Sequence, residues 1–291
     1  MTTSLATIRQ SLALLVPGAL VGTASSESSA SELWDTNWEM VTFGADGAQD
    51  FTGYWIVRSS AVAAGDRVRR VAFHDQGLGR IKPSRVWTNS PASETYELWP
   101  PDFRPTLVDQ AINDGLARLT YRVEGSITPV ANDNAYALSS LTWITGERDV
   151  REVWKRYTSS NYQEDQPWGW WRVLDNAGTF TLVLDPMPHS TTGITIVVEG
   201  VAKYGTLSSD SATTAAPSDW VVAAAKVELY RKITSDAKNQ GAAGWGADYI
   251  EARREFNRLS KLYAPRVPRR SPLWRSPTRM PFPGQTRTVY V

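Results

Sequence analysis

The segment PSDWVVAAAKVELYRKITSDAKNQ, residues 217–240, predicts a long amphipathic helix. Its first residues, Pro217, Ser218 and Asp219, are types that favour the start of a helix. The apolar residues that follow recur at helical spacing, which directs one face of the helix toward a core. These residues are Val221, Val222, Ala225, Leu229 and Ile233.

A second helix is predicted for ADYIEARREFNRLSKLYA, residues 247–264. The glycine-rich stretch GAAGWG, residues 241–246, separates it from the first helix and indicates a turn. The two segments together therefore predict a helical hairpin over residues 209–264. The apolar residues of the second helix are spaced for burial against the first: Tyr249, Ile250, Phe256, Leu259 and Tyr263.

The final segment, residues 265–291, contains six prolines and six arginines but no acidic residue. Proline removes a backbone donor and restricts the residue before it, so the segment predicts an extended basic arm. At about 3.1 Å per residue, these 27 residues reach on the order of 80 Å, enough to cross neighbouring subunits of an assembly. The alternatives are a disordered tail and a DNA-binding arm.

Two further helices are predicted closer to the N-terminus. In residues 3–16, Ile8, Leu12, Leu15 and Val16 lie at helical spacing, and Pro17 and Gly18 then end the pattern. This apolar stretch is too short and too interrupted for an export signal or a membrane span. The other helix lies within residues 102–124 and starts near Asp102 or Thr106. Its apolar residues are Leu107, Ala111, Ile112, Leu116 and Leu119.

Two β-rich stretches lie between these helices, in residues 25–101 and 125–208. Short aromatic and β-branched runs are separated by turn residues, which is typical of antiparallel strands. The predicted fold is therefore α+β, with a helical hairpin or bundle, an inserted antiparallel β-sandwich resembling a jelly roll, and the extended arm. The expected segments are residues 1–24, 25–101, 102–124, 125–208, 209–264 and 265–291.

The composition indicates a chain that can bury a hydrophobic core and that contains no thiol groups. Hydrophobic residues make up 42% of the 291 residues and the net charge is +1, so the basic character is confined to the arm. The absence of cysteine excludes disulfides and thiolate metal sites. The two histidines, His74 and His189, do not form a zinc motif, and no phosphate-binding loop is present. The sequence therefore predicts no metal, no cofactor and no enzymatic activity.

Two groups of residues leave an enzyme or a sugar binder open as an alternative. His74 beside Asp75 could be half of a hydrolytic triad, but no nucleophile motif accompanies it, and a histidine at a strand end is the favoured interpretation. Two carboxylate pairs lie near aromatic residues, as in glycoside hydrolases, but surface carboxylates are the favoured interpretation. The pairs are Glu94 with Glu97, and Glu164 with Asp165.

The tryptophans of WGWW are a candidate contact surface. In a strand, Trp168 and Trp170 would share one face and Trp171 would lie on the other. One face would belong to the core, and the other would bind a neighbouring subunit or a sugar. We therefore take Trp168 and Trp171 as candidate subunit contacts.

Four segments together resemble the virion proteins of tailed bacteriophages, most of all the head-to-tail adaptor or connector proteins. They are SLATIRQSLALLV (residues 4–16), ETYELWPPDFRPTLVDQAINDGLARL (94–119), SDWVVAAAKVELYRKI (218–233) and YIEARREFNRLSKLYA (249–264). The resemblance covers the helices in outline, and the β-rich parts depart from it as insertions. Phage tail, fibre-base and decoration proteins, which carry such sandwiches, are therefore alternatives within the virion.

The resemblance implies a structural protein of the virion neck, assembled in the host cytoplasm and without a membrane. It implies a homo-oligomeric ring of twelve copies below the portal protein, in contact with other neck or tail proteins and with packaged DNA in the channel. The contact residues follow from the arm's own chemistry, because arginines pair with acidic partners and large apolar side chains anchor an interface. They are Arg266, Arg269, Arg270, Leu273, Trp274, Arg275, Arg279, Phe282, Arg287 and Tyr290.

Overall fold

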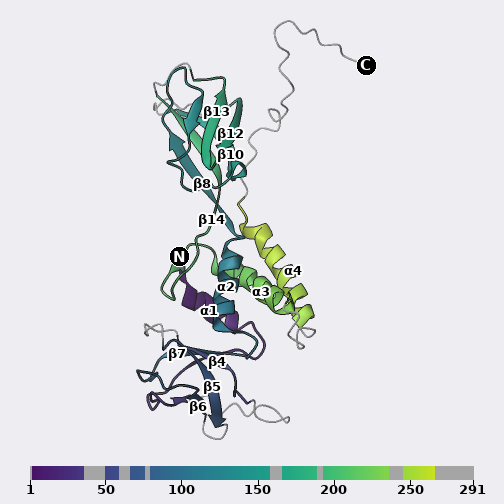
Figure 1. Ribbon diagram of the computed structural model, residues 1–291. Coiled ribbons are helices and arrows are strands. Elements are labelled where there is room, and N and C mark those ends of the chain that lie inside the picture. The colour runs from purple at the N-terminus through teal and green to yellow at the C-terminus, as the bar shows by residue number, and fades with distance from the viewer. Residues whose placement is uncertain are drawn as a thin grey trace. The chain divides into compact units, whose positions relative to one another are not determined.

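The computed structural model describes residues 2–35, 50–58, 66–75, 79–157, 166–188, 193–235 and 245–265. The chain divides into two compact units. Unit 1 combines Met1–Leu119 with Lys203–Ala264, and unit 2 contains Thr120–Ala202. Both helices and antiparallel sheets are present (Figure 1), so the predicted α+β class is confirmed.

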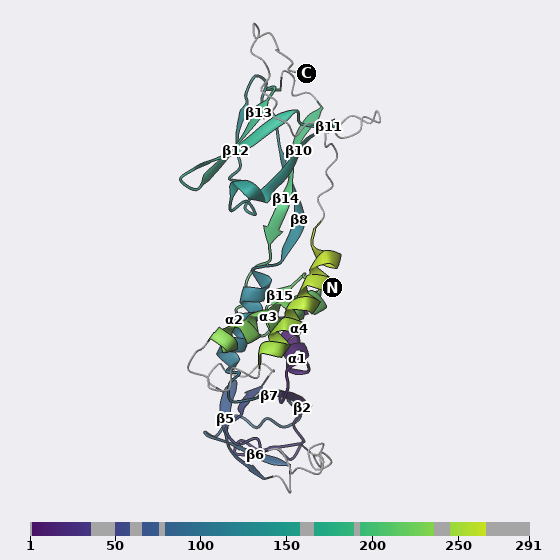
Figure 2. The ribbon, with the colours of Figure 1, turned by 90° about the vertical axis from the view of Figure 1, so that its right-hand side faces the viewer.

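The helices of the described residues belong to unit 1 and share one core. They are α1 (Leu5–Ala13), α2 (Pro105–Leu116), α3 (Ser218–Ser235) and α4 (Gly246–Tyr263). Figures 1 and 2 show α3 and α4 side by side as the predicted hairpin, with α2 against α3. The periodic apolar residues thus identified all four helices, because each helix buries one stripe in the common core.

Helix α1 is shorter than the predicted helix. It begins after Ser4, whose side chain accepts a hydrogen bond from the Thr7 backbone N–H at 3.2 Å. It ends at Ala13, and Gly18 adopts a positive φ of 77° in the turn that follows. The predicted burial of Leu15 is wrong, because this residue lies beyond the helix and is 51% exposed.

Helix α2 begins at Pro105, where the missing backbone N–H costs no hydrogen bond. Neither Asp102 nor Thr106 caps it, since the residue before the helix is Arg104 and makes no side-chain cap. On α4, the predicted burial of Ile250 is wrong: this side chain is 53% exposed. The buried stripe of α4 follows Ala252 and Leu259 instead.

The first β-rich stretch forms a six-stranded antiparallel sheet in unit 1, with the order β2-β7-β4-β5-β6-β3 among the described residues. Its inner face packs around a second core that includes Leu33, Ile56, Val71 and Ile81. The strands are β2 (Leu20–Thr23), β3 (Leu33–Trp34), β4 (Trp55–Arg58), β5 (Val68–Asp75), β6 (Arg80–Pro83) and β7 (Thr95–Trp99). A short antiparallel pair joins β1 (Thr3–Ser4), which precedes α1, to β15 (Thr213–Thr214), which precedes α3.

Strand β7 connects the two cores of unit 1. Its side chains alternate, as in any strand, between the two faces of the sheet. Tyr96 and Leu98 enter the core of the sheet, whereas Trp99 enters the core of the helices. Glu97 points to the same side as Trp99, and Figures 1 and 2 show this strand beside α1. A carboxylate is therefore buried where the sheet meets the helices.

Unit 2 contains two antiparallel sheets that share one core, as the predicted sandwich requires. In the described residues the orders are β11-β10-β14-β8 and β12-β13-β9. The turn between β12 and β13 is formed by Ala177 and Gly178, both with positive φ, which suits a two-residue hairpin. The elements are β8 (Thr120–Ile127), β9 (Ala135–Ala137), η2 (Glu147–Asp149), β10 (Val150–Tyr157), β11 (Gln166–Pro167), β12 (Trp170–Asn176), β13 (Thr179–Asp185) and β14 (Ile194–Lys203).

Candidate functional site

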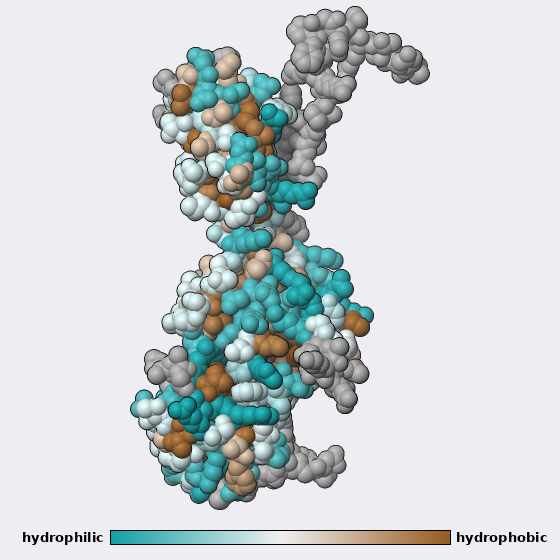
Figure 3. Space-filling model, viewed as in Figure 1, coloured by the Kyte–Doolittle hydropathy of each residue, from teal (hydrophilic) through white to brown (hydrophobic). Residues whose placement is uncertain are grey.

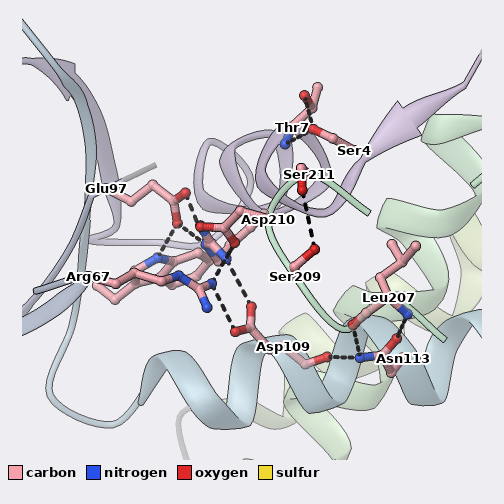
Figure 4. A network of polar contacts seen from close by, with 12 residues as sticks. Ser4, Thr7, Arg67, Glu97, Asp109, Asn113, Leu207, Ser209, Asp210 and Ser211 are labelled. Atoms are coloured by element: carbon pink, nitrogen blue, oxygen red, sulfur yellow. Dashed lines mark hydrogen bonds and ion pairs between the residues drawn. The ribbon is translucent and has the colours of Figure 1, made fainter. Parts of the chain in front are cut away.

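A buried ion network joins helix α1 to the rest of unit 1. The Arg9 Nε donates to both carboxylate oxygens of Glu97, at 2.7 and 3.0 Å, and neither side chain is exposed. The Arg9 Nη1 donates to Asp109 of α2 at 3.1 Å and to Asp210, in the loop before α3, at 2.8 Å. Figure 4 shows these carboxylates converging from separate elements. A single guanidinium thus ties α1, α2, β7 and this loop together.

Arg67 adds a second positive charge to the network. Its Nη2 lies 3.1 Å from Asp109 and 2.7 Å from Asp210. Burial tends to lower the pKa of Arg9, but the nearby carboxylates outweigh it and raise that pKa. Burial also raises the pKa of Glu97, although Arg9 and the indole of Trp99 donate to its carboxylate. Its ion pairs join α1, α2, β7 and the loop before α3, so the network positions these elements relative to one another.

The residues that suggested hydrolytic chemistry have structural roles. Glu94 is bound by Arg58 at 2.7 Å, and Glu97 belongs to the network above. The Nδ1 of His74 accepts a hydrogen bond from the Phe51 backbone N–H at 3.3 Å. The favoured interpretation of Glu94 and Glu97 as surface carboxylates is wrong for Glu97, which is fully buried, and arginines bind both carboxylates. Glu164, Asp165 and His189 lie outside the described residues.

The tryptophans of unit 2 do not alternate as expected. Trp168 is only 4% exposed, and its indole N–H donates to the Pro186 carbonyl at 3.1 Å. Trp170 is 42% exposed and carries the Arg172 guanidinium over its ring. Trp168 and Trp170 do not share a face, because β12 begins only at Trp170. Trp168 therefore has almost no surface left for a subunit contact, whereas Trp171, partly buried, remains a predicted one.

The helical hairpin is held together at both ends. At one end, the indole of Trp220 donates to Ser260 at 3.0 Å, and the hydroxyl of Tyr263 donates to Asp219 at 2.8 Å. At the other end, the Trp245 ring stacks on Tyr230 with centroids 5.7 Å apart. These contacts fix α4 along α3 and determine where the chain leaves the helices.

A groove of about 530 Å³ runs along the hairpin. Four apolar residues of α3 and α4 line it, together with the exposed Leu15 that follows α1. Its charged residues are of both signs. The apolar residues of the hairpin are Val222, Ala223, Ala252 and Leu259, and the charged ones are Asp219, Lys226, Glu251, Arg254, Glu255 and Arg258.

The groove combines a hollow with apolar lining residues. On the face seen in Figure 3, apolar residues form separate spots among hydrophilic ones, as is common on protein surfaces. Leu15, which is 51% exposed, lines the groove. An exposed apolar surface next to a hollow is typical of a contact with another protein segment.

Neither a metal site nor a membrane-spanning helix is found among the described residues. No group of three or more His, Asp or Glu side chains among them could hold a metal ion. In the same part of the chain, no helix is long and apolar enough to cross a membrane. The groove is therefore the candidate functional site.

Comparison with protein families agrees with the resemblance found in the sequence. The family model of the SU10 adaptor protein matches residues 78–277, which is more than half of the chain. The chain belongs to the SU10 adaptor protein family. The predicted resemblance to head-to-tail adaptors is thus confirmed, and the chain is a structural phage adaptor protein.

Other known proteins add little to this assignment. No curated protein matches the adaptor. One solved structure that is similar to it is described as "Neck of empty GTA particle computed with C6 symmetry". The two chains are 16% identical, the match covers 56% of the adaptor and 77% of the other chain, and the TM-score is 0.22. The family match alone therefore carries the identification.

The predicted contact residues of the arm lie outside the described residues. The structure follows the adaptor as far as Pro265, immediately after α4. The residues concerned are Arg266, Arg269, Arg270, Leu273, Trp274, Arg275, Arg279, Phe282, Arg287 and Tyr290.

The Arg9 network and the groove were not found by sequence analysis. Arg9 does carry a signal, because Leu5, Ile8, Arg9 and Leu12 lie on one face of a helix. A charged residue within a buried stripe needs a partner of opposite charge. Its partners, however, could not be named from this pattern.

Proposed function

We propose that this adaptor forms a ring of twelve copies below the portal protein and docks through its C-terminal helices and arm. The observation that carries the proposal is the exit of the chain from α4. Ala264 ends the helix with φ −57° and ψ 132°, an extended conformation, and Pro265 follows. The helix therefore ends at Ala264 in an extended conformation, and the basic segment follows directly in the sequence.

The composition of the arm suits docking onto a neighbouring protein. Six arginines without an acidic residue favour a partner rich in carboxylates, because guanidinium groups bind carboxylates with two parallel hydrogen bonds. The prolines lower the entropy lost on binding. Large side chains such as Trp274, Phe282 and Tyr290 are typical anchors of an interface. The portal is the expected partner, and packaged DNA in the channel is a further one.

In this proposal the adaptor acts in the virion neck and is assembled beforehand in the host cytoplasm. The rival functions are those of a tail or capsid-decoration protein, or of a carbohydrate-binding module that uses the tryptophans of unit 2. The carbohydrate-binding alternative remains because Trp170 is exposed.

Removal of residues 266–291 is expected to abolish capture of the portal while unit 1 and unit 2 stay folded. Light scattering of the full-length and truncated chains, each alone and with purified portal, measures this. A variant with every arm arginine changed to lysine is the matched control, because it keeps the charge but loses bidentate binding. We expect it to bind the portal with intermediate affinity.

If the truncated chain captures the portal as well as the intact chain does, the proposed role of the arm is wrong. Glycan binding that is lost in Trp170→Ala and unaffected by the truncation would instead support the carbohydrate-binding alternative.

A further inference from the structure

No segment among the described residues of unit 1 fills the apolar groove of the hairpin. Val222, Ala223, Ala252 and Leu259 line it, and Leu15 projects beside it with half of its surface exposed. Apolar surface in a hollow is stabilised when another chain covers it. The groove is therefore suited to receive an extended peptide with large apolar side chains.

The geometry of α4 disfavours docking of a chain's own arm in its own groove. The groove extends along α4 from Leu259 back to Glu251, that is, away from the end of the helix. At Ala264 the backbone is extended, and Pro265 follows directly. To enter its own groove, the chain would have to reverse at residues where proline restricts the backbone. The arm is better placed to reach a neighbouring copy.

The sequence of the arm contains an anchor at a suitable distance. Leu273 and Trp274 are the first large apolar pair after α4. They follow Ala264 by nine and ten residues, which span on the order of 30 Å when extended. The family match reaches residue 277 and so includes this pair. The first part of the arm therefore belongs to the region that defines the family.

We propose that the groove formed by Leu15, α3 and α4 binds the arm segment around Leu273 and Trp274 of a neighbouring copy of the adaptor. This proposal rests on the proposed ring, and it divides the arm between two partners. Residues 266–274 link adjacent subunits, and residues 275–291 remain for the portal.

The charges along the groove complement the arm only in part. Arg258 already binds Glu255 at 2.6 Å, and Asp219 accepts the hydroxyl of Tyr263. Glu251 has no ion-pair partner among the described residues and is exposed beside the groove. An arginine of the incoming arm thus has one carboxylate to bind, and apolar burial provides the main contribution to affinity.

Cross-linking between introduced cysteines tests the proposal, because the natural chain has none. Glu255→Cys places a thiol at the groove, and Ser271→Cys places one beside the anchor. Treatment of the full-length double variant with a short bis-maleimide is expected to yield a ladder of linked subunits. Asn257→Cys with Ser271→Cys is the matched control, since Asn257 is exposed on α4 but does not line the groove. Addition of Leu15→Glu, at a half-exposed position, is expected to remove the ladder.

Each outcome of the cross-linking experiment either supports or contradicts binding of the arm by a neighbouring copy. A ladder from the Glu255 variant alone supports the proposal. A cross-link confined to single chains, equal yields from both variants, or no cross-link overturns it. As a second measurement, Trp274→Ala is expected to weaken self-association on the order of 30-fold in light scattering.

The portal is absent from both experiments, so their failure leaves the portal-docking role untouched. Conversely, deletion of residues 275–291 is expected to abolish portal capture but to preserve the ladder. A loss of both properties in this deletion would contradict the division of the arm.

Discussion

Arg9→Ala is expected to lower the stability of unit 1 by about 3–5 kcal/mol, because it leaves a buried carboxylate without its partner. The side chains of Arg9 and Glu97 are both fully buried, and the Arg9 Nε lies 2.7 Å from the Glu97 carboxylate. The change also removes the link from α1 to Asp109 and Asp210. Thermal unfolding measures the effect, and a decrease in melting temperature on the order of 10 °C is expected.

Two variants separate the buried charge from other causes. Arg258→Ala breaks the exposed pair with Glu255 and is expected to leave the melting temperature unchanged within error. In the double variant Arg9→Met with Glu97→Gln, the fully buried pair carries no charge, Asp109 and Asp210 keep Arg67 as a partner, and the Trp99 indole keeps an acceptor. We expect this double variant to recover part of the lost stability. If Arg9→Ala unfolds at the same temperature as the natural chain, the network does not hold the helices together.

The helices could be predicted from the sequence, but their ends were less certain. The periodic apolar residues indicated all four helices because each one buries a single stripe. Leu15 and Ile250 also fitted the spacing and yet are exposed. Leu15 lies past the end of α1, and Ile250 lies beside the stripe that Ala252 and Leu259 define. Spacing does not reveal where a helix stops or which of two adjacent apolar residues is buried.

The groove and the ion network could not be predicted because their parts are distant in the sequence. Arg9 binds Glu97, Asp109 and Asp210, which are 88, 100 and 201 residues away. Local patterns carry no information on such pairings, which depend on how β7, α2 and the loop before α3 pack around α1. The misassigned Trp168 is a smaller case of the same kind, because its burial depends on where β12 begins.

Gly200→Ala is expected to disrupt the β-sandwich of unit 2 at a cost of about 3 kcal/mol or more. Gly200 is buried in β14 opposite Val150, where a register shift in β10 brings another part of the backbone close. A Cβ atom at this position would lie 2.1 Å from the Asp149 carbonyl oxygen and 2.7 Å from the Trp143 ring. A side chain could move aside, but the carbonyl of Asp149, which ends η2 directly before β10, cannot do so without shifting the backbone that leads into the paired strand.

Hydrogen exchange read by mass spectrometry is the appropriate measurement, because it reports on each unit separately. Amides of β10, β13 and β14 should lose protection in Gly200→Ala, whereas those of α3 and α4 should keep it. Gly146→Ala is the matched control in the same unit, since its nearest neighbour would lie at 3.9 Å. Addition of Trp143→Ala should restore only part of the protection, because the Asp149 carbonyl remains in place. Full restoration would identify the ring as the obstacle, and equal loss in α3 and α4 would mean that the two units unfold together.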